Sequence, residues 1–490
     1  MYIKEEVSIM SNTTQALSRI EAILDDSSFV EIGARVTARA TDFNMQEKKA
    51  PSDGVITGYG VVNGNLVYVY SQDASVLGGT IGEMHAKKIA SLYEKAMKMG
   101  APVIGLIDCA GLRLQEATDA LNGFGEIYKN MSLASGIIPQ ITAVYGECGG
   151  GLAVLAELSD FIFVEEKKAK LFVNSPNALD GNYESKLDTS SAKFMAEAGV
   201  VDFVGDEETI ANGVRQLVSM LPSNNAEGTV CTDNQDDLNR VCQDMEAEIA
   251  DPALALTDIS DDGVFVEAKA EYAKEMVTGF ILVDGVTVGA VANRTALYDE
   301  NGEKAEEFAT VLTTAGAYKA AEFVTFCNAF EIPVLTLTNV KGFEATVKSE
   351  RTIAKAAAKL VYAFSNADVP KVNIITGEAY GSAYVAMNSK SIGADMVYAW
   401  PQASIGMMDA SLAAKIMYAD DIAASKDVTS TINEKAAEYA ALQSSVDQAA
   451  ARGYVDTIIN PEDTRKYVVA AFEMLFDKRE VRADKKHGTV

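Results

Sequence analysis

The chain repeats itself at a distance of 231 residues, and this internal repeat restricts its possible folds more than any other feature of the sequence. Residues 138–154 read IPQITAVYGECGGGLAV and residues 369–385 read VPKVNIITGEAYGSAYV, so the two segments align without a gap. Upstream, APVIGLIDCAGLRLQ at 101–115 aligns with IPVLTLTNVKGFEAT at 332–346 at the same spacing. Self-similarity over this distance indicates two copies of one domain, which also suits a chain too long for a single core.

We therefore predict an α/β protein of two tandem domains, residues 1–245 and 246–490. Each copy begins with a predicted β-hairpin, whose turn is Asn-Gly in GVVNGNLVYVYS (60–71) and Asp-Gly in FILVDGVTVGAV (280–291). A helical stretch, an apolar strand, a glycine loop, a second helix, a second strand and a second glycine loop follow in both copies. This alternation is typical of an α/β domain with glycine loops at its strand ends.

The glycine loops are the predicted functional site. In GECGGGLAVLAEL (146–158) and GEAYGSAYVAM (377–387), a buried strand runs into small residues and then into an apolar helical pattern. Small residues leave the first N–H groups of the helix accessible to an anion, although close packing also selects them. A second N–H group is expected from CAGLR (109–113) in the first copy and from KGFEATV (341–347) in the second. Two N–H groups converging on one oxygen form an oxyanion hole, and the pattern occurs twice.

Composition argues against several other functions. The sequence has 70 acidic and 42 basic residues, and its net charge of −28 would repel nucleic acid. Its only histidines are His85 and His487, which disfavours Ser-His-Asp, Cys-His and histidine-ligated metal chemistry. The five cysteines form no C-x-x-C pair, and neither a signal peptide nor an apolar stretch of about 18 residues is evident. We expect a cytoplasmic enzyme without a metal ion, whose mechanism relies on backbone groups.

Five segments resemble the biotin-dependent acyl-CoA carboxyltransferase family, which includes propionyl-CoA carboxylase β subunits and the α subunits of methylmalonyl-CoA and glutaconyl-CoA decarboxylases. They extend over nearly the whole chain and are SDGVITGYGVVNGNLVYVYSQDASVLGGTIGEMHAKKI (52–89), GAPVIGLIDCAGLRLQEA (100–117), IPQITAVYGECGGGLAV (138–154), VPKVNIITGEAYGSAYVAMNSK (369–390) and YAWPQASIGMM (398–408). The resemblance implies a crotonase-type fold, a ββα superhelix, in each half. It places acyl-CoA in the first domain and biotin in the second, with the active site between halves of two different subunits.

The resemblance also assigns roles to individual residues. Three backbone N–H groups would form the acyl-CoA oxyanion site, those of Gly111, Gly150 and Gly151. Four residues would form the biotin-ureido site, namely Val347, Gly381, Ser382 and Ala383. Because the first copy keeps the family's glycines better, we also expect CoA phosphates to contact Lys87, Lys88 or Arg113, although surface solvation explains either lysine more simply. Val385 follows the second loop where family members vary with the acyl chain, and core packing explains a valine there equally well.

The family's reaction moves a carboxyl group between carboxybiotin and the α-carbon, or the vinylogous position, of a short acyl-CoA. The ureido nitrogen can take the α-proton, so no side-chain base is required, in agreement with the shortage of histidine. Biotin is expected on a separate carrier protein: AMKM around Lys98 copies a biotinylation sequence, but it lies in a predicted helix. The other expected partners are a biotin carboxylase or a membrane decarboxylase β subunit, and further copies of the chain in a dimer or trimer of dimers.

Two other functions stay open at the level of the sequence. Glu147 and Glu378 occupy matched positions and could be the acid and base of a biotin-independent crotonase-type hydratase or isomerase, although stabilisation of a helix start through its dipole is the simpler explanation. A scaffold that binds CoA esters without turnover is the other alternative. The biotin side departs further from the family, since Lys341 and Ser382 replace a usual proline and glycine. The sequence decides neither the acyl group nor the direction of the reaction.

Overall fold

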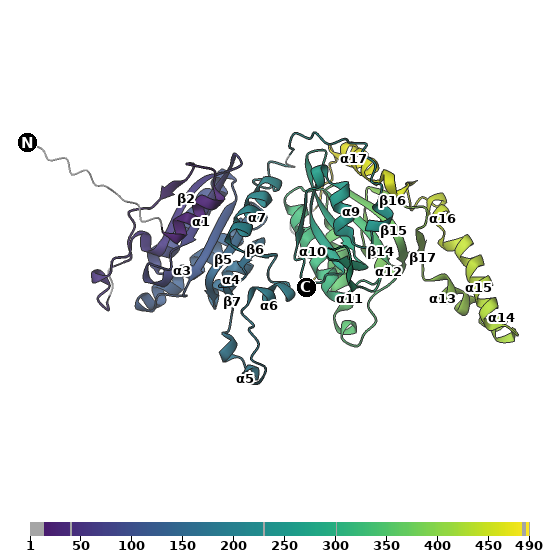
Figure 1. Ribbon diagram of the computed structural model, residues 1–490, viewed down its shortest axis with the longest axis horizontal. Coiled ribbons are helices and arrows are strands. Elements are labelled where there is room, and N and C mark those ends of the chain that lie inside the picture. Colours follow the sequence, from purple (N-terminus) through teal and green to yellow (C-terminus); the bar gives the residue numbers. More distant parts are fainter. Residues whose placement is uncertain (1–13, 40–41, 229–230, 300, 483–486, 490) are drawn as a thin grey trace, which may run out of the picture. The chain divides into compact units, whose positions relative to one another are not determined.

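The computed structural model describes residues 14–39, 42–228, 231–299, 301–482 and 487–489 (Figure 1). The chain divides into two compact units, Met1–Asn224 and Asn225–Val490. The segment after Asn224 packs with the second unit, where the Thr232 N–H group donates to the Gly285 carbonyl at 2.9 Å. Each unit contains its own mixed sheet with helices, which confirms the predicted α/β class and tandem architecture. Among the helices of the described residues, none is long and apolar enough to cross a membrane.

The first unit is built on one eight-stranded sheet. Its strands follow the order β1-β2-β3-β4-β5-β6-β8, with β7 paired to β5; the pairs within β1–β3 are antiparallel and the later pairs are parallel. The strands are β1 (Val30–Ile32), β2 (Val55–Val62), β3 (Asn65–Gln72), β4 (Val103–Cys109), β5 (Gln140–Gly149), β6 (Phe161–Glu165), β7 (Lys170–Phe172) and β8 (Phe203–Gly205). The helices are α1 (Gln15–Ile23), α2 (Glu83–Met99), α3 (Ala117–Ala134), α4 (Gly151–Glu157), α5 (Asn182–Ser185), α6 (Ala192–Glu197) and α7 (Glu207–Met220).

The second unit has the equivalent sheet, ordered β18-β16-β15-β14-β11-β10-β9 with β17 paired to β15, and a separate β12-β13 pair. The strands are β9 (Phe265–Ala268), β10 (Met276–Val283), β11 (Val286–Asn293), β12 (Ala296–Tyr298), β13 (Lys304–Glu307), β14 (Val334–Val340), β15 (Lys371–Tyr380), β16 (Met396–Ala399), β17 (Ser404–Gly406) and β18 (Thr457–Ile458). The helices are α8 (Met245–Glu248), α9 (Pro252–Ile259), α10 (Thr314–Ala329), α11 (Ile353–Asn366), α12 (Gly381–Ala386), α13 (Ala410–Met417), α14 (Ala419–Ala424), α15 (Val428–Tyr439), α16 (Val446–Ala451) and α17 (Thr464–Leu475).

The predicted hairpins are confirmed, and their turns have the required backbone. β2 pairs with β3 and β10 pairs with β11, both antiparallel. The turn residues all have positive φ, with 49° and 84° at Asn63 and Gly64 and 51° and 71° at Asp284 and Gly285. Positive φ at both central residues defines the type I′ turn, which matches the twist of the flanking strands.

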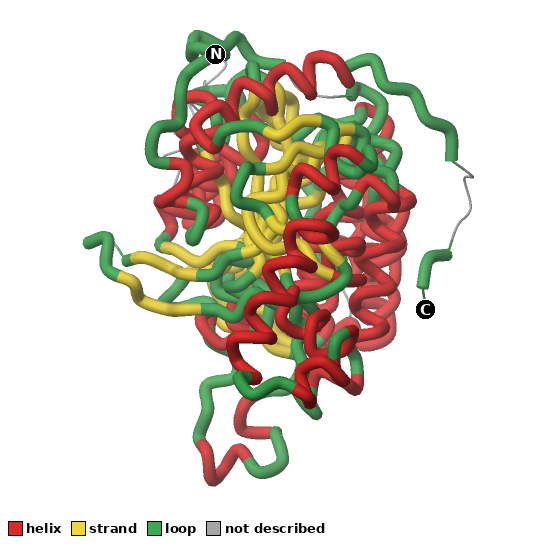
Figure 2. Tube along the Cα trace, turned by 90° about the vertical axis from the view of Figure 1, so that its right-hand side faces the viewer, coloured by secondary structure: helices red, strands yellow, loops and turns green. Residues whose placement is uncertain are grey.

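Helices cover both faces of the sheet in the second unit, and the alternation of side chains along β11 shows which helices lie on which face (Figures 1 and 2). Val288, Ala290 and Ala292 belong to one hydrophobic cluster with residues of α9 and α17. Between them, Gly289 faces α10, where an added Cβ would lie 2.5 Å from the Cys327 Sγ. Because successive strand residues point to opposite faces, α9 and α17 cover one face and α10 covers the other.

The two units differ in the link between their hairpin and the next helix. Residues 73–82 connect β3 to α2, whereas residues 294–313 connect β11 to α10 and are twice as many. The longer link contains the β12-β13 hairpin. The repeat spacing of 231 residues therefore applies from α2 onward and changes upstream of this insertion.

Candidate functional site

In the first unit, the two glycine loops follow the carboxyl ends of two neighbouring parallel strands. Cys109 at the end of β4 is the register partner of Cys148 near the end of β5. Gly111 follows the first strand, and Gly150 and Gly151 follow the second at the start of α4. Carboxyl ends of parallel strands lie at one edge of a sheet, which is where α/β proteins bind ligands. The structure thus brings together the three glycines predicted for the acyl-CoA side.

The repeated Gly-Glu pair has a structural cause at this edge. A Cβ added at Gly146 would collide with the Asp108 carboxylate of the neighbouring strand. At the equivalent place in the second unit, a Cβ at Gly377 would lie 2.7 Å from Asn339 Oδ1. That oxygen accepts the N–H group of Glu378 at 3.0 Å. In each unit, a polar side chain of one strand thus fills the space next to a glycine of the neighbouring strand, and a larger residue in place of that glycine would collide with it.

The three glycines of the first unit present their N–H groups differently. The Gly150 N–H group donates to the Phe172 carbonyl at 2.8 Å, and the Gly111 N–H group points to the Cys109 Sγ at 3.3 Å. Gly151 is the first residue of α4, and the first N–H groups of a helix have no carbonyl in that helix to donate to. Gly151 is therefore the best placed of the three to donate to a ligand.

In the second unit, α12 begins with the three residues predicted for the biotin side. Gly381 has φ of +62°, a backbone conformation that favours glycine, and Ser382 is exposed. Ala383 is buried and Val385 is half-buried one turn further along. Val347 lies on the neighbouring loop after β14, and 82% of its surface is exposed. The site of the second unit is therefore an open helix start beside an exposed loop.

A model of the carboxyl transferase domain matches residues 11–490 of this chain. The chain belongs to the carboxyl transferase family. It is 39% identical over 493 residues to the methylmalonyl-CoA decarboxylase subunit alpha of Propionigenium modestum. The aligned region covers 98% of this chain and 93% of that relative. It is 38% identical over 489 residues to the propionyl-CoA carboxylase beta chain of Roseobacter denitrificans, with 97% and 93% covered.

Solved structures agree with this membership. The crystal structure of transcarboxylase 12S with hydrolyzed methylmalonyl-coenzyme A bound matches with a TM-score of 0.89 and 35% identity, over 96% of this chain and 92% of that chain. The likeness confirms the crotonase-type fold predicted for the two tandem domains. The chain is an enzyme component, the carboxyltransferase subunit of an acyl-CoA carboxylase or decarboxylase, as the sequence predicts.

Two of the three cations predicted to contact CoA phosphates are buried in this carboxyltransferase. The Lys88 ammonium donates to the Ser52 carbonyl at 3.1 Å and to the Val55 carbonyl at 2.5 Å, and burial lowers its pKa to about 8. The Arg113 side chain is 1% exposed and pairs with carboxylates. Lys87 is exposed and pairs with Glu83 at 2.6 Å. Of the three, Lys87 alone presents its charge to solvent.

The carboxyltransferase uses His85 as a structural residue. The ring is fully buried, where its Nδ1 lies 2.9 Å from the Asp53 carbonyl and its Nε2 lies 3.2 Å from the Gln72 amide. Burial lowers the His85 pKa to about 3, so the imidazole is neutral at physiological pH. Lys98 lies on the exposed surface of α2, which confirms the predicted helix around the AMKM sequence.

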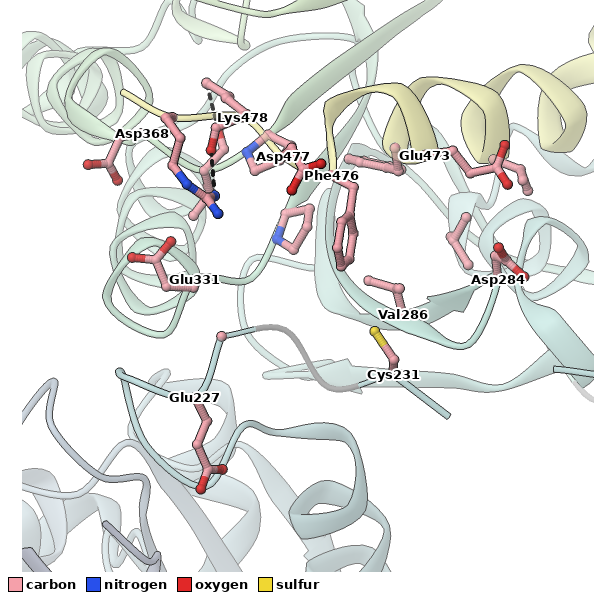
Figure 3. Close-up of a pocket in the computed structure, with 18 of the residues that line it drawn as sticks. Glu227, Cys231, Asp284, Val286, Glu331, Asp368, Glu473, Phe476, Asp477 and Lys478 are labelled. Atoms are coloured by element: carbon pink, nitrogen blue, oxygen red, sulfur yellow. Dashed lines mark hydrogen bonds between the residues drawn. The ribbon is translucent and has the colours of Figure 1, made fainter. Parts of the chain in front are cut away.

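A cavity of about 790 Å³ in the second unit lies away from the glycine loops (Figure 3). Its wall includes Pro333 and Pro370, which directly precede β14 and β15, so it lies at the amino ends of these parallel strands. Gly342 and Gly381 follow the carboxyl ends of the same strands. The cavity is at the opposite edge of the sheet and is not part of the candidate site.

The partners of Arg113 are not evident from the sequence. They are Asp53, which is 60 positions away in sequence, and Glu116, which is three positions away. The spacing of Arg113 and Glu116 is visible in the sequence, but it resembles an ordinary exposed pair in a first helical turn. The burial of both side chains depends on the packing of α2 against α3, which no local pattern reveals.

Proposed function

We propose that this carboxyltransferase moves a carboxyl group between biotin on a separate carrier protein and the α-carbon of propionyl-CoA, with methylmalonyl-CoA as the carboxylated partner. The observation that carries the proposal is similarity along the whole chain to a methylmalonyl-CoA decarboxylase subunit and to a propionyl-CoA carboxylase chain. These two names describe opposite directions across the same pair of acyl-CoA compounds. The transcarboxylase 12S structure, with hydrolyzed methylmalonyl-coenzyme A bound, supports the same substrate class.

The first unit would bind the acyl-CoA. The N–H group of Gly151 and an N–H group of the loop 110–113 would stabilise the enolate oxygen that develops on the thioester carbonyl. Gly150 and Gly111 would shape these two segments, since their own N–H groups have partners within the fold. Lys87 would offer its exposed charge to a CoA phosphate.

The second unit would bind the biotin ureido group. Gly381, Ser382 and Ala383 supply the first N–H groups of α12, and Val347 supplies one from an exposed loop. A helix start that is open to solvent fits a ureido oxygen, because such N–H groups and the helix dipole favour a developing negative charge. Bound biotin would supply the nitrogen that carries the carboxyl group. Val385, one turn along α12, would limit the space for the substrate.

The partners follow from the same family membership. We propose a biotin carrier protein, together with a biotin carboxylase or a membrane decarboxylase β subunit, and assembly of several copies of the chain. The matched relatives are themselves named as a subunit and a chain, and the 12S structure is described as a hexamer assembly. A cytoplasmic location stays a prediction of the sequence.

The direct test is transfer to free biotin by the purified chain. Methylmalonyl-CoA and biotin should give propionyl-CoA and carboxybiotin, and omission of biotin should abolish propionyl-CoA formation. Hydration of crotonyl-CoA without biotin would instead identify a hydratase. Binding of methylmalonyl-CoA with no product under either condition would identify a scaffold, and both outcomes contradict the proposal. Malonyl-CoA in place of methylmalonyl-CoA tests the acyl group.

A further inference from the structure

Arg113 is the most heavily bonded cation near the glycine loops of the first unit, and no substrate role explains its burial. Its Nη1 donates to Asp53 Oδ1 at 2.5 Å and to Glu116 Oε1 at 2.8 Å. Its Nη2 donates to the Thr80 carbonyl at 2.7 Å. Both carboxylate side chains are 0% exposed. One guanidinium thus joins three separate segments in a region closed to water.

The two carboxylates extend this network to the start of α2. Glu116 Oε2 accepts the N–H group of Glu83, the first residue of α2, at 2.6 Å. Asp53 Oδ2 accepts the N–H group of His85 in the same helical turn at 2.7 Å. Carboxylates are favoured at a helix N-terminus because they pair with its free N–H groups and its dipole. Gly82, directly before α2, leaves space for the guanidinium, because a Cβ added at Gly82 would collide with Arg113 Nη1.

The loop that carries Gly111 pairs with residue Ile81, which lies between Thr80 and Gly82 in the segment that the network holds. The Ile81 N–H group donates to the Gly111 carbonyl at 2.9 Å, and the Arg113 N–H group donates to the Ile81 carbonyl at 2.9 Å. Backbone groups of an extended segment point alternately to its two sides. The N–H group of Leu112 is therefore directed away from Ile81, and the loop offers this N–H group as a donor.

The second unit keeps this backbone pairing, since the Leu312 N–H group donates to the Gly342 carbonyl at 2.9 Å and the Glu344 N–H group donates to the Leu312 carbonyl at 3.0 Å, but it lacks the ion network. Glu344 stands at the position of Arg113, and the exposed Val347 stands at the position of the buried Glu116. In place of the ions, hydroxyl groups bond within its loop, where the Thr346 N–H group donates to Ser349 Oγ at 3.0 Å. The ion network is therefore a feature of the first unit and not a requirement of the repeated fold.

We propose that Arg113 is a positioning residue for the acyl-CoA half of the reaction, which holds the loop 110–113 and the start of α2 so that the Leu112 N–H donor is preformed. This rests on the proposed function, in which the first unit binds acyl-CoA. A preformed donor needs no rearrangement when charge develops on the thioester oxygen, so it lowers the barrier to turnover more than it tightens ground-state binding. The expected signature is a loss in kcat with a nearly unchanged KM for acyl-CoA.

The test is Arg113→Lys, which retains the charge but cannot reach both carboxylates and Thr80 together. We expect kcat for carboxyl transfer per folded site to fall by about 10²-fold, as a misplacement near 1 Å does, while the KM for methylmalonyl-CoA changes by less than about threefold. The titre of CoA-ester binding counts the folded sites. Arg294→Lys is the matched control, because Arg294 is an equally buried arginine of the second unit, paired with Asp251 at 2.7 Å. It should leave kcat per folded site unchanged.

Hydrogen exchange gives a second readout that does not depend on turnover. In Arg113→Lys, amides of residues 109–116 should exchange roughly tenfold faster, and those of residues 341–348 should not change. Unchanged exchange in 109–116 would overturn the proposal even if the wild-type chain failed to use biotin. Full kcat per folded site with a lowered Tm would also overturn it, because Arg113 would then be purely structural. Equal exchange increases in both segments would overturn the assignment to the first unit.

Discussion

Equivalent arginines anchor the helix that precedes the sheet in each unit, α1 in the first and α9 in the second, but these arginines are buried to different degrees. In the first unit, Arg215 on α7 donates to the carbonyl of Ile23, the last residue of α1, at 2.6 Å. It also donates to Asp25 Oδ1 at 2.8 Å. Asp25 in turn accepts the N–H group of Gly64 in the hairpin turn at 3.1 Å. One arginine thus connects the last helix, the first helix and the hairpin.

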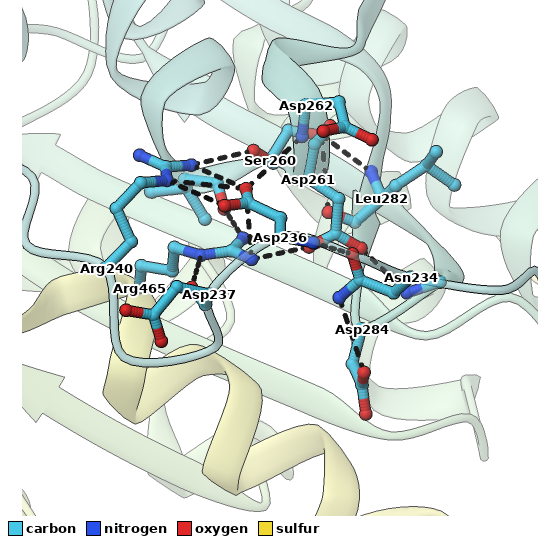
Figure 4. Close-up of polar contacts among 12 residues, drawn as sticks. Asn234, Asp236, Asp237, Arg240, Ser260, Asp261, Asp262, Leu282, Asp284 and Arg465 are labelled. Carbon is cyan, nitrogen blue, oxygen red and sulfur yellow. Dashed lines mark hydrogen bonds and ion pairs between the residues drawn. The ribbon is translucent and has the colours of Figure 1, made fainter.

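We call such an arginine with its partners a clasp, and the second unit has the equivalent clasp around Arg465, which is fully buried (Figure 4). Arg465 on α17 donates to the Ile259 carbonyl at 2.5 Å and to Asp261 Oδ1 at 2.7 Å, and it also pairs with Asp236 at 3.3 Å. Its side chain is 0% exposed, whereas 25% of the Arg215 side chain is exposed. The first unit instead buries an arginine beside its glycine loop, at Arg113. The repeat preserves the contacts of Arg215 and Arg465, whereas the ion network of Arg113 occurs in the first unit without a counterpart at Glu344.

The largest loss of stability is expected for Arg465→Met. Removing one partner of a buried ion pair leaves uncompensated charge and costs about 3–5 kcal/mol in the free energy of unfolding. Trp400, the only tryptophan, lies fully buried in the second unit and donates to Thr464 Oγ1 at 3.1 Å. Urea unfolding followed by Trp400 fluorescence therefore reports the second unit.

Arg215→Met is the matched control for this measurement. It should shift the Trp400 transition less than Arg465→Met does, because Arg215 belongs to the first unit and part of its ion pair is screened by solvent. Equal shifts in the two variants would show that burial does not distinguish the clasps. The two clasps would then contribute equally to the free energy of unfolding despite their different exposure.

The sequence predicts the fold further than it predicts the clasps and the ion network. Constant spacing aligned β4 and β5 with β14 and β15, and the Asn-Gly and Asp-Gly turns located both hairpins. The equivalence of Arg215 and Arg465 is not evident from the constant spacing. Segments of different length, among them α5 in one unit and α13–α15 in the other, separate these arginines from the glycine loops and change their spacing. The burial of Lys88 and Arg113, both predicted as CoA-phosphate contacts, is not evident from the sequence, because Ser52, Val55 and Asp53 lie 33 to 60 positions away from the cations that they bind. The sequence pattern reveals the repeated domain, whereas the burial of a charged side chain depends on tertiary packing.

The second prediction concerns the helix start of α12 and tests whether the second unit uses backbone donors. Ser382→Ala keeps the N–H group and should be nearly silent, whereas Ser382→Pro deletes it within the first turn, where proline is tolerated. Loss of one oxyanion donor costs about 10²–10³ in rate, so biotin-dependent transfer should fall by that factor. Affinity for methylmalonyl-CoA, measured by calorimetry, should stay near the wild-type value. An inactive alanine variant, or a folded proline variant with full transfer, would contradict the assignment.

The third prediction compares two buried lysines at equivalent positions, Lys88 and Lys319. Lys319 donates to the carbonyls of Lys269 and Tyr272 at 2.8 Å each, and burial lowers its pKa to about 7, against about 8 for Lys88. An unfolded lysine titrates near pH 10.4, so above each lowered pKa the unfolded chain binds a proton that the folded chain has lost. Stability therefore rises with pH, by at most about 1.4 kcal/mol per pH unit for each lysine.

Between pH 7 and 8 this rise should come mainly from the second unit. Lys319→Met should therefore flatten the pH dependence of the Trp400 unfolding transition in that window, whereas Lys88→Met should leave it as steep as in the wild type. Unfolding at pH 6.5, 7.5 and 8.5 provides the measurement. A wild-type slope retained in Lys319→Met would show that the amine is not neutralised in this range.

The smallest effects are predicted for Glu147 and Glu378, the matched carboxylates before the two helix starts. Glu147 is exposed four residues before Gly151, and Glu378 is half-buried with its backbone N–H group bound to Asn339. If each carboxylate only stabilises the following helix through its dipole, replacement by glutamine should cost about 0.3–1 kcal/mol in stability. Carboxyl transfer should then stay within about twofold of wild type, because a general acid or base contributes at least about 10²-fold. A loss of that size in Glu147→Gln alone, with binding of methylmalonyl-CoA intact, would show that the first unit uses a side-chain acid or base that the second does not.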